Sequence, residues 1–207
     1  MKKRLILLLL STGSFLKGAV VFTEGPVLLT PSLGLFEIDF DGNGTTDVSF
    51  QKITSPIFNN HISGSITTEV VVNSDPDVGG AQPLERGDLI GPLLSDAYSF
   101  LSLELRGQVG RLQLLSAFTS GDFLIEQGPF FRRTAYAGFS FEGEEGTHYG
   151  YALIRDNEAT ASITVLNWAY ESEAGVPIVA GAIPEPSTFA FCLLSLIPVF
   201  RRARPGI

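Results

Sequence analysis

Apolar residues recur at every second position in several short runs of this chain, and Gly and Pro separate the runs. The alternation appears at Phe36, Ile38 and Phe40, at Val48 and Phe50, at Ala135, Ala137, Phe139 and Phe141, and at Ile163 and Val165. A period of two places such residues on one face of a β-strand, where β-branched and aromatic side chains pack well. No long segment shows the period of an amphipathic helix. We therefore expect an all-β fold.

Other runs rich in Val, Ile, Thr and aromatic residues extend this expectation. They are Ile66–Val72, Tyr98–Leu105, Arg111–Phe118, Tyr149–Arg155 and Thr160–Tyr170. Many short strands joined by turns predict an antiparallel β-sandwich, jelly-roll-like, in one domain over residues 20–182. Residues 73–92 hold several Pro, Gly and acidic residues, so we expect a long surface connection or an edge excursion there. The tripeptide Arg86-Gly87-Asp88 in it is interpreted as a chance match to an adhesion motif.

The N-terminal residues have the composition of a secretory signal peptide. Met1 to Arg4 is basic, Leu5 to Leu10 is aliphatic, and small residues follow up to Ala19. The alternative is a core helix, which the charges before Leu5 and the absence of amphipathic periodicity disfavour. We expect residues 1–19 to be removed during export.

The C-terminal residues combine a proline-rich hinge, an apolar run and a basic end. Pro184-Glu185-Pro186-Ser187 precedes the run Thr188–Phe200, and Arg201, Arg202 and Arg204 follow it. Cationic side chains stay on the cytoplasmic side of a membrane because their transfer through the bilayer is costly. The segment is therefore predicted to be a short membrane helix whose arginines stop transfer.

This arrangement resembles the PEP-CTERM sorting signal, with Pro184, Glu185 and Pro186 as the sorting motif and residues 183–207 as the whole signal. The resemblance implies Gram-negative export, recognition and cleavage by exosortase, and transient anchoring in the inner membrane. It also implies a final place in the cell envelope or extracellular matrix, associated with exopolysaccharide or biofilm. The segments His148–Ala152, Leu166–Glu171 and Pro177–Ile178 are similar to the strands that close many ectodomains of this family, which often have Trp where Tyr151 stands.

The charge between the two ends excludes one class of partner. All 22 acidic residues but only seven of the 14 Lys and Arg lie between Val20 and Phe200, a balance of −15. Such a surface repels phosphate backbones, so we expect no nucleic-acid binding. The only cysteine, Cys192, lies in the C-terminal apolar run, which excludes an intrachain disulfide.

Residues 39–47 contain the most specific chemical pattern. Oxygen ligands for calcium are predicted from Asp39, Asp41, Asn43, Thr45 (through its carbonyl) and Asp47, with Gly44 at the sixth position as in an EF-hand-like loop. The acid expected at the twelfth position is missing, because Phe50 stands there. The alternative interpretation is a β-hairpin, since Asn43-Gly44 is a favoured type I′ turn pair. The two interpretations are compatible.

Trp168 and Tyr170 lie two residues apart and so share a face of a predicted strand, where they could stack on sugar rings. Core packing is the commoner alternative. No Gly-x-Ser-x-Gly, metalloprotease or nucleotide-binding motif occurs, although acidic pairs that could hydrolyse glycosides remain. We predict a non-catalytic exported surface or matrix protein. The alternative function is a carbohydrate-binding module, with calcium as the one cofactor considered, and an enzyme acting on a glycan comes third.

Overall fold

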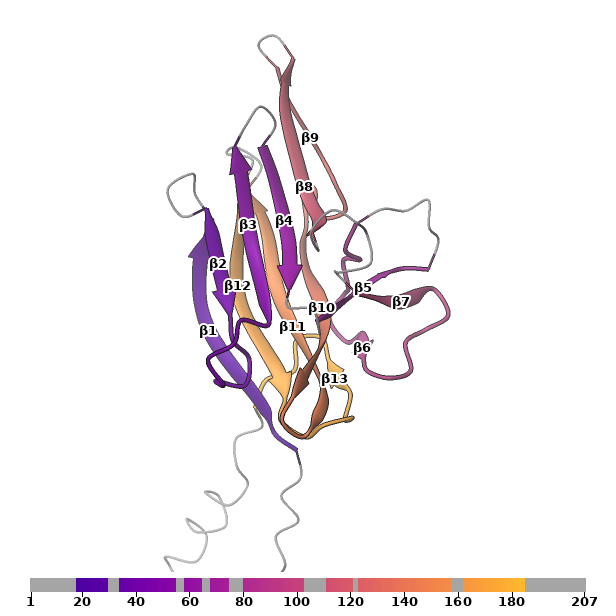
Figure 1. The fold of residues 1–207 in the computed structure, drawn as a ribbon. Helices are drawn as coiled ribbons and strands as arrows, with labels where there is room; N and C mark the ends of the chain where they lie inside the picture. The colour runs from indigo at the N-terminus through magenta and orange to yellow at the C-terminus, as the bar shows by residue number, and fades with distance from the viewer. Residues whose placement is uncertain are drawn as a thin grey trace, which may run out of the picture.

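A computed structural model describes residues 18–29, 34–54, 58–64, 68–74, 80–102, 111–120, 123–157 and 162–184 of the chain. In these ranges the protein is all-β, with no helix (Figure 1). The all-β prediction is therefore confirmed for the part of the chain that the structure describes.

The larger sheet is antiparallel and has six strands. Their order is β1 (Val20–Leu28), β12 (Ser162–Glu171), β11 (Gly146–Asn157), β10 (Thr134–Gly143), β5 (Glu69–Asn73) and β7 (Tyr98–Ser102). Strands β10, β11 and β12 are consecutive in the chain and form its centre, whereas β1 and β5 pair over long sequence separations. The first and the last long strands of the domain are therefore neighbours.

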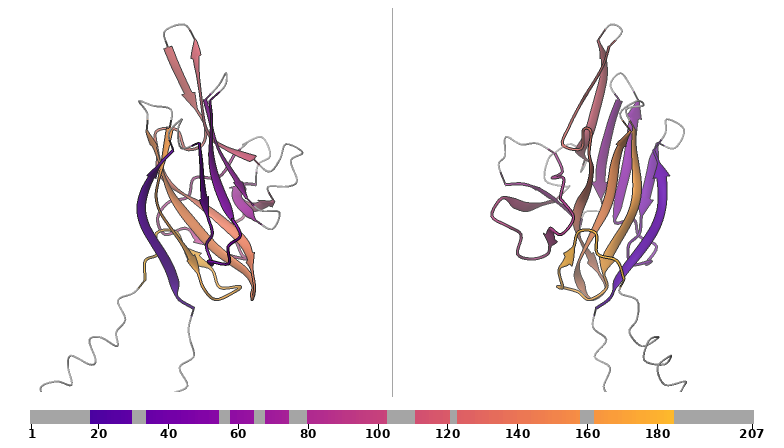
Figure 2. Two further views of the ribbon diagram at one scale, coloured as in Figure 1. Left: turned by 60° about the vertical axis from the view of Figure 1, so that its left-hand side comes forward. Right: turned by 180° about the vertical axis from the view of Figure 1, so that it is seen from behind.

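A second sheet has five strands, and a third has two. The second has the order β2 (Leu35–Ile38), β3 (Val48–Thr54), β4 (Phe58–Gly64), β8 (Arg111–Ser120) and β9 (Phe123–Gln127). The third pairs β6 (Leu89–Ile90) with β13 (Ile178–Val179). Figure 2 shows the five-stranded and six-stranded sheets as two layers that run in a similar direction.

Side chains of both large sheets meet in one buried cluster. The five-stranded sheet and the loop after β2 contribute Ile38, Phe40, Val48 and Phe50, and the six-stranded sheet contributes Val70, Val72, Ala135, Ala137, Phe139, Phe141, Ala152, Ile154, Ile163 and Val165. Phe40 stacks on Phe141 with ring centroids 5.0 Å apart. Phe50 meets Phe139 edge to face at 6.4 Å. The alternating residues of the sequence are thus the residues that the fold buries.

The opposite face of the six-stranded sheet is buried as well. Val71, Tyr149, Tyr151 and Ala169 of that sheet pack with Leu84, Ile90, Ile178 and Ala180, which come from the segments around β6 and β13. The Tyr151 hydroxyl donates to the carbonyl of Ala182 at 2.5 Å, so this covering segment is also hydrogen-bonded to the sheet. The centre of the sheet is consequently enclosed between two apolar layers.

Residues 73–92 are the main difference from the expected loop. Ala81 forms a bridge to Val72 of β5 and Leu84 forms one to Tyr136 of β10, so the segment pairs with the six-stranded sheet. Ala81, Leu84 and Ile90 have at most 1% of their surface exposed. The expectation of a surface connection is wrong for these residues, because the second face of the sheet needs an apolar cover. The alternative, an edge excursion, matches in part: the segment pairs with the sheet, but with the inner strands β5 and β10.

Strands β1, β4, β6 and β9 were not predicted from the sequence. In β1 the pairing with β12 shifts between Glu24 and Val27, where Gly25 and Pro26 interrupt the ladder. An interrupted ladder hides the period of two in the sequence, because the residues after the shift face the other way.

Most of both predicted targeting segments lies outside the described residues. Residues 1–17 of the expected signal peptide lie outside them. So do residues 185–207 of the expected sorting signal, among them Glu185, Pro186, Arg201, Arg202 and Arg204. Pro184 is exposed and ends the described chain. Within the described ranges no helix has the length and apolar character that a membrane crossing requires.

The second apolar layer gives a prediction about stability. Ile90→Ala should lower the free energy of unfolding by about 2 to 4 kcal/mol, because the fully buried side chain leaves a cavity against the sheet. Leu89→Ala, one residue away, is the control: Leu89 is 49% exposed, and we expect a loss of roughly 0.5 kcal/mol or less. Urea unfolding of both variants measures the difference. Equal losses would show that β6 does not close a core.

Candidate metal site

The acidic loop is the connection of a β-hairpin. Ile38 of β2 pairs with Val48 of β3, and the backbone N–H of Asp47 donates to the carbonyl of Ile38 at 2.9 Å. This closure brings Asp39 and Asp47, the first and last residues of the connection, next to each other. The hairpin interpretation of residues 39–47 is therefore confirmed.

The turn itself differs from the expected type I′ turn at Asn43-Gly44. A type I′ turn requires a positive φ at both central residues. Here the positive values belong to Gly42 (74°) and Gly44 (85°), with Asn43 between them not among them. The connection is a longer loop because its backbone folds around the side chain of Asp39 instead of closing directly between the strands.

The carboxylate of Asp39 organises this loop from inside. Its Oδ1 accepts the N–H of Gly42 at 2.8 Å and that of Asn43 at 3.2 Å, and its Oδ2 accepts the N–H of Gly44 at 2.8 Å. Asp41 Oδ1 in turn accepts the N–H of Asn43 at 3.1 Å. These bonds fix the direction of both carboxylates. Asp39 Oδ1 uses both of its lone pairs in them, whereas Asp39 Oδ2 and Asp41 Oδ1 each use one of two.

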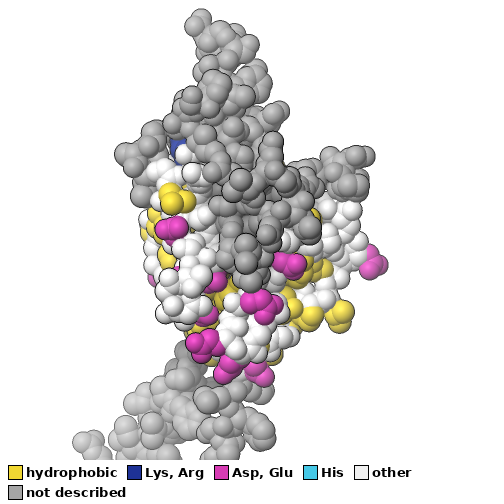
Figure 3. Space-filling model, viewed as in Figure 1, with side chains coloured by type: hydrophobic (Ala, Val, Ile, Leu, Met, Phe, Trp, Pro, Cys, Tyr) yellow, Lys and Arg dark blue, Asp and Glu magenta, His cyan; other side chains and the backbone are white. Residues whose placement is uncertain are grey.

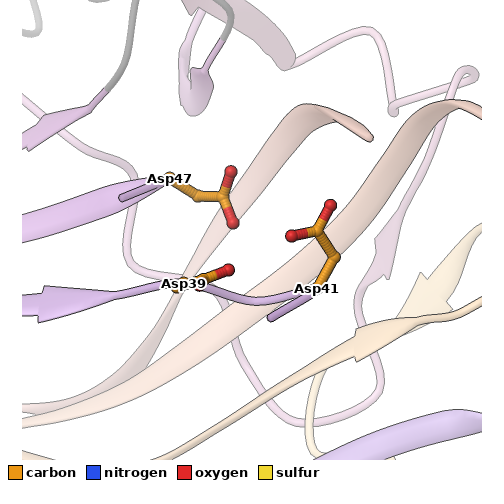
Figure 4. Close-up of side chains that lie close together, drawn as sticks. All are labelled: Asp39, Asp41 and Asp47. Atoms are coloured by element: carbon orange, nitrogen blue, oxygen red, sulfur yellow. The ribbon is translucent and has the colours of Figure 1, made fainter. Parts of the chain in front are cut away.

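Three carboxylates converge above the loop. Each of Asp39, Asp41 and Asp47 offers one oxygen, and these oxygens lie within 4.8 Å of one another. Figure 4 shows the carboxylates of Asp39 and Asp47, at the two ends of the hairpin connection, and the carboxylate of Asp41 facing a common space. Calcium binds oxygens at 2.3–2.6 Å, so two ligands of one ion are at most ~5.2 Å apart. The triad fits that limit.

The other two expected ligands are placed differently. Asn43 uses its side chain within the loop: its Nδ2 donates to Asp41 Oδ2 at 2.9 Å, and its Oδ1 accepts the N–H of Thr45 at 2.7 Å. Asn43 and Thr45 are thus part of the loop's own hydrogen bonding, and their role as ligands stays a prediction. Phe50, at the twelfth position, is fully buried in the core, so any further ligand has to come from elsewhere.

Asp47 is the buried member of the triad, with 3% of its surface exposed. Burial raises the pKa of its carboxyl to about 6; the N–H of Phe40, which it accepts at 2.8 Å, opposes the rise, and the nearby charges of Asp41 and Asp39 add to it. A cation among the three groups would remove this unfavourable burial of negative charge.

Residues distant in the sequence adjoin the triad. Asp41 and Asn43 line an open depression of about 380 Å³ together with Glu144, Glu145, His148, Tyr170 and Ser172. Figure 3 shows acidic side chains gathered at the lower end of this face. The Nδ1–H of His148 donates to the carbonyl of Glu171 at 2.9 Å, which fixes the orientation of the ring. Tyr170 was singled out in the sequence as a sugar-stacking residue, but no sequence signal placed it or the other neighbours beside the acidic loop, because the depression is formed by elements that approach only after the sheets have assembled.

Gly143, at the turn of the β10–β11 hairpin, allows that hairpin to approach the β2–β3 hairpin closely. A Cβ at this position would lie 3.0 Å from His148 Nε2 and 3.3 Å from Asp41 Oδ2. The histidine and the aspartate therefore face each other across a glycine, and any side chain there would separate them.

Trp168 and Tyr170 share one side of β12, as predicted, and both pack against the core between the sheets. Trp168 meets Phe36 edge to face at 5.4 Å, and Tyr170 meets Phe141 at 5.7 Å. Only Tyr170 of the two lines the depression. The carbohydrate platform stays a prediction, and the contacts agree with the alternative of core packing.

The raised pKa of Asp47 predicts how stability depends on pH in the presence of chelator. The folded protein binds the proton of this carboxyl more tightly than the unfolded chain, so stability should fall as pH rises from about 4 to about 6. Asp47→Asn keeps an acceptor for the N–H of Phe40 and removes the titration. We expect it to be more stable than the wild type at pH 7, on the order of 1 kcal/mol after solvent screening, and to lose this advantage at pH 4. Thermal unfolding of both proteins from pH 4 to pH 7 is the measurement. A stability advantage of the variant that is equal at pH 4 and pH 7 contradicts the raised pKa of Asp47.

Comparison with known proteins gives no relative to set beside this geometry: no family model matches the chain, and neither a curated protein nor a solved structure matches it.

Proposed function

We propose that this chain is a non-catalytic surface or matrix protein, exported and sorted by exosortase, whose domain carries a weak calcium site. The carboxylate triad of Asp39, Asp41 and Asp47 is the observation that carries the calcium site. The export and sorting steps are supported by the sequence at the two ends, and by the exposure of Ile183 and Pro184 at the start of the motif. Exposure there suits a segment that a membrane enzyme has to reach.

The proposal takes residues 20–182 as one β-sandwich domain of jelly-roll type. Its support is the buried cluster to which the five-stranded and six-stranded sheets both contribute. Val20, the first residue of the domain, pairs with Glu171 at the end of β12, and β13 lies at the same end of the molecule (Figure 1), so the chain enters and leaves the domain at one end. Entry and exit at one end suit a domain that is displayed from a membrane or matrix.

The calcium affinity is expected to be low. Three aspartates supply single oxygens, and no bidentate acid follows at the twelfth position. Sites of this kind fall in the range of extracellular modules, with Kd of ~10⁻⁴ to 10⁻³ M. Such an affinity is useful where calcium is abundant, outside the cell.

A second candidate function is a calcium-dependent carbohydrate-binding module. One observation favours it: Tyr170 lines the same depression as Asp41, so an aromatic ring and a proposed cation site adjoin one cavity. A glycan array on the purified protein, with calcium and with chelator, separates the two functions. A matrix spacer binds no glycan, whereas the module binds one only with calcium.

The calcium site is tested by melting curves in millimolar calcium and in chelator. The wild type should melt several degrees higher with calcium, because an ion at about ten times its Kd adds roughly 1.4 kcal/mol to the stability of the folded state. The double variant Asp41→Ala, Asp47→Ala should lose the shift. Asp88→Ala, an acid outside the triad, is the matched control and should keep it. A shift that is missing in the wild type, or unchanged in the double variant, would falsify the site.

The sorting signal is tested by mass spectrometry of the mature protein from an exosortase-positive host. We expect a C-terminus near Pro184-Glu185-Pro186, since the run Thr188–Phe200 has 13 residues and suits a temporary anchor better than a permanent one. In a host without exosortase the chain should keep Ile207. Recovery of Ile207 from both hosts contradicts the proposal.

A further inference from the structure

The outer side of the small β6–β13 sheet is apolar and exposed. Ile90 pairs with Ile178, and both point inward, whereas the neighbouring pair Leu89 and Val179 points outward. Leu89 is 49% exposed and Val179 is 41% exposed. Two further exposed apolar side chains follow closely in the same segments: Leu93 is 83% exposed and Ile183 is 59% exposed. We call these four residues the β6–β13 patch. Figure 3 shows hydrophobic side chains exposed on this side of the molecule.

The β6–β13 patch belongs to the segment from which the chain leaves the domain. The N–H of Ala182 donates to the carbonyl of Val179 at 2.9 Å, and Ile183, the last residue of the patch, directly follows this turn. From Ile183 to the first residue of the apolar run, Thr188, there are five residues, which span at most ~18 Å when fully extended. Whatever holds the apolar run is therefore within ~18 Å of the patch.

The apolar run is also short for its expected surroundings. Its 13 residues would give a helix of ~20 Å, whereas the hydrocarbon core of a bilayer is ~30 Å thick. A segment that is too short draws its flanking residues into the interface between water and lipid. Residues 183–187 are the flank on the side of the domain.

We infer that the β6–β13 patch lies on the lipid surface while the C-terminal run is inserted, so the domain rests on the membrane in one orientation. This inference rests on the proposed membrane insertion of residues 188–200. A lipid bilayer is the occupant because it is the one apolar phase that the short connection brings within reach. Electrostatic attraction contributes little, since the region from Val20 to Phe200 carries a balance of −15 and would be repelled by anionic lipids. The contact is therefore apolar, and added salt should not weaken it.

The experiment uses the full chain with Cys192→Ser, inserted into vesicles of phosphatidylethanolamine and phosphatidylglycerol (3:1). A single cysteine in place of Leu89 carries an environment-sensitive fluorophore, and a portion of the lipid carries bromine near the headgroup. The matched control places the same fluorophore at Leu28, which is 46% exposed and lies at the far end of β1 from the chain entry (Figure 1). We expect brominated lipid to quench the probe at position 89 by about twofold or more, at low and high salt, and to leave position 28 unquenched.

Flotation of the vesicles is measured on the same samples. Chains that float with the vesicles while position 89 stays unquenched overturn the inference and leave the membrane insertion intact. Chains that do not float overturn both, since the tether is then missing. A blue-shifted probe at position 89 that bromine does not quench shows that a second copy of the chain covers the patch, which also overturns the inference. Equal quenching at positions 89 and 28 contradicts a single orientation.

Discussion

The two apolar faces of the six-stranded sheet are the constraint on which the rest of the domain depends. Antiparallel sheets commonly leave one face to water, but the central strands β10 and β11 bury side chains on both. The five-stranded sheet covers one face with Phe40 and Phe50. The other face needs residues 81–98 and 176–182, which have little regular structure of their own. Their conformation is set by the surface that they cover.

The conformation of the acidic loop, residues 39–47, depends on the packing of Phe40 between the two large sheets. Phe40 lies between Asp39 and Asp41 in the sequence, and its ring is held in the core by Phe139 and Phe141. The anchored ring fixes the backbone from which the two aspartates project, and the closed hairpin fixes Asp47. Negative charges are consequently held together by apolar packing, at a cost visible in the raised pKa of Asp47. A loop without this anchor would let the three carboxylates separate.

Sequence patterns predicted the strands whose residues alternate, and the hairpin between Ile38 and Val48, because these features depend on local periodicity. The role of residues 81–98 was not predictable in this way. Their polar composition indicates a loop, and only the uncovered face of Tyr149 and Tyr151 explains why Leu84 and Ile90 are buried. Likewise, Asp39, Asp41 and Asp47 were found by their spacing, whereas His148 and Glu144 adjoin them through the packing of separate hairpins. No local pattern encodes such an approach.

Strand β1 pairs only with β12, from Val20 opposite Glu171 to Leu28 opposite Thr164. Synthesis proceeds from the N-terminus, so β1 is made before the other strands of the domain. Its partner β12 is made only when nearly the entire domain has been synthesised. An unpaired strand exposes a row of backbone donors and acceptors that another chain can use. Closing so long a loop is also slow, which lengthens the period of exposure. The six-stranded sheet can therefore be completed only after β12 has been synthesised, so the folded state of the domain forms late.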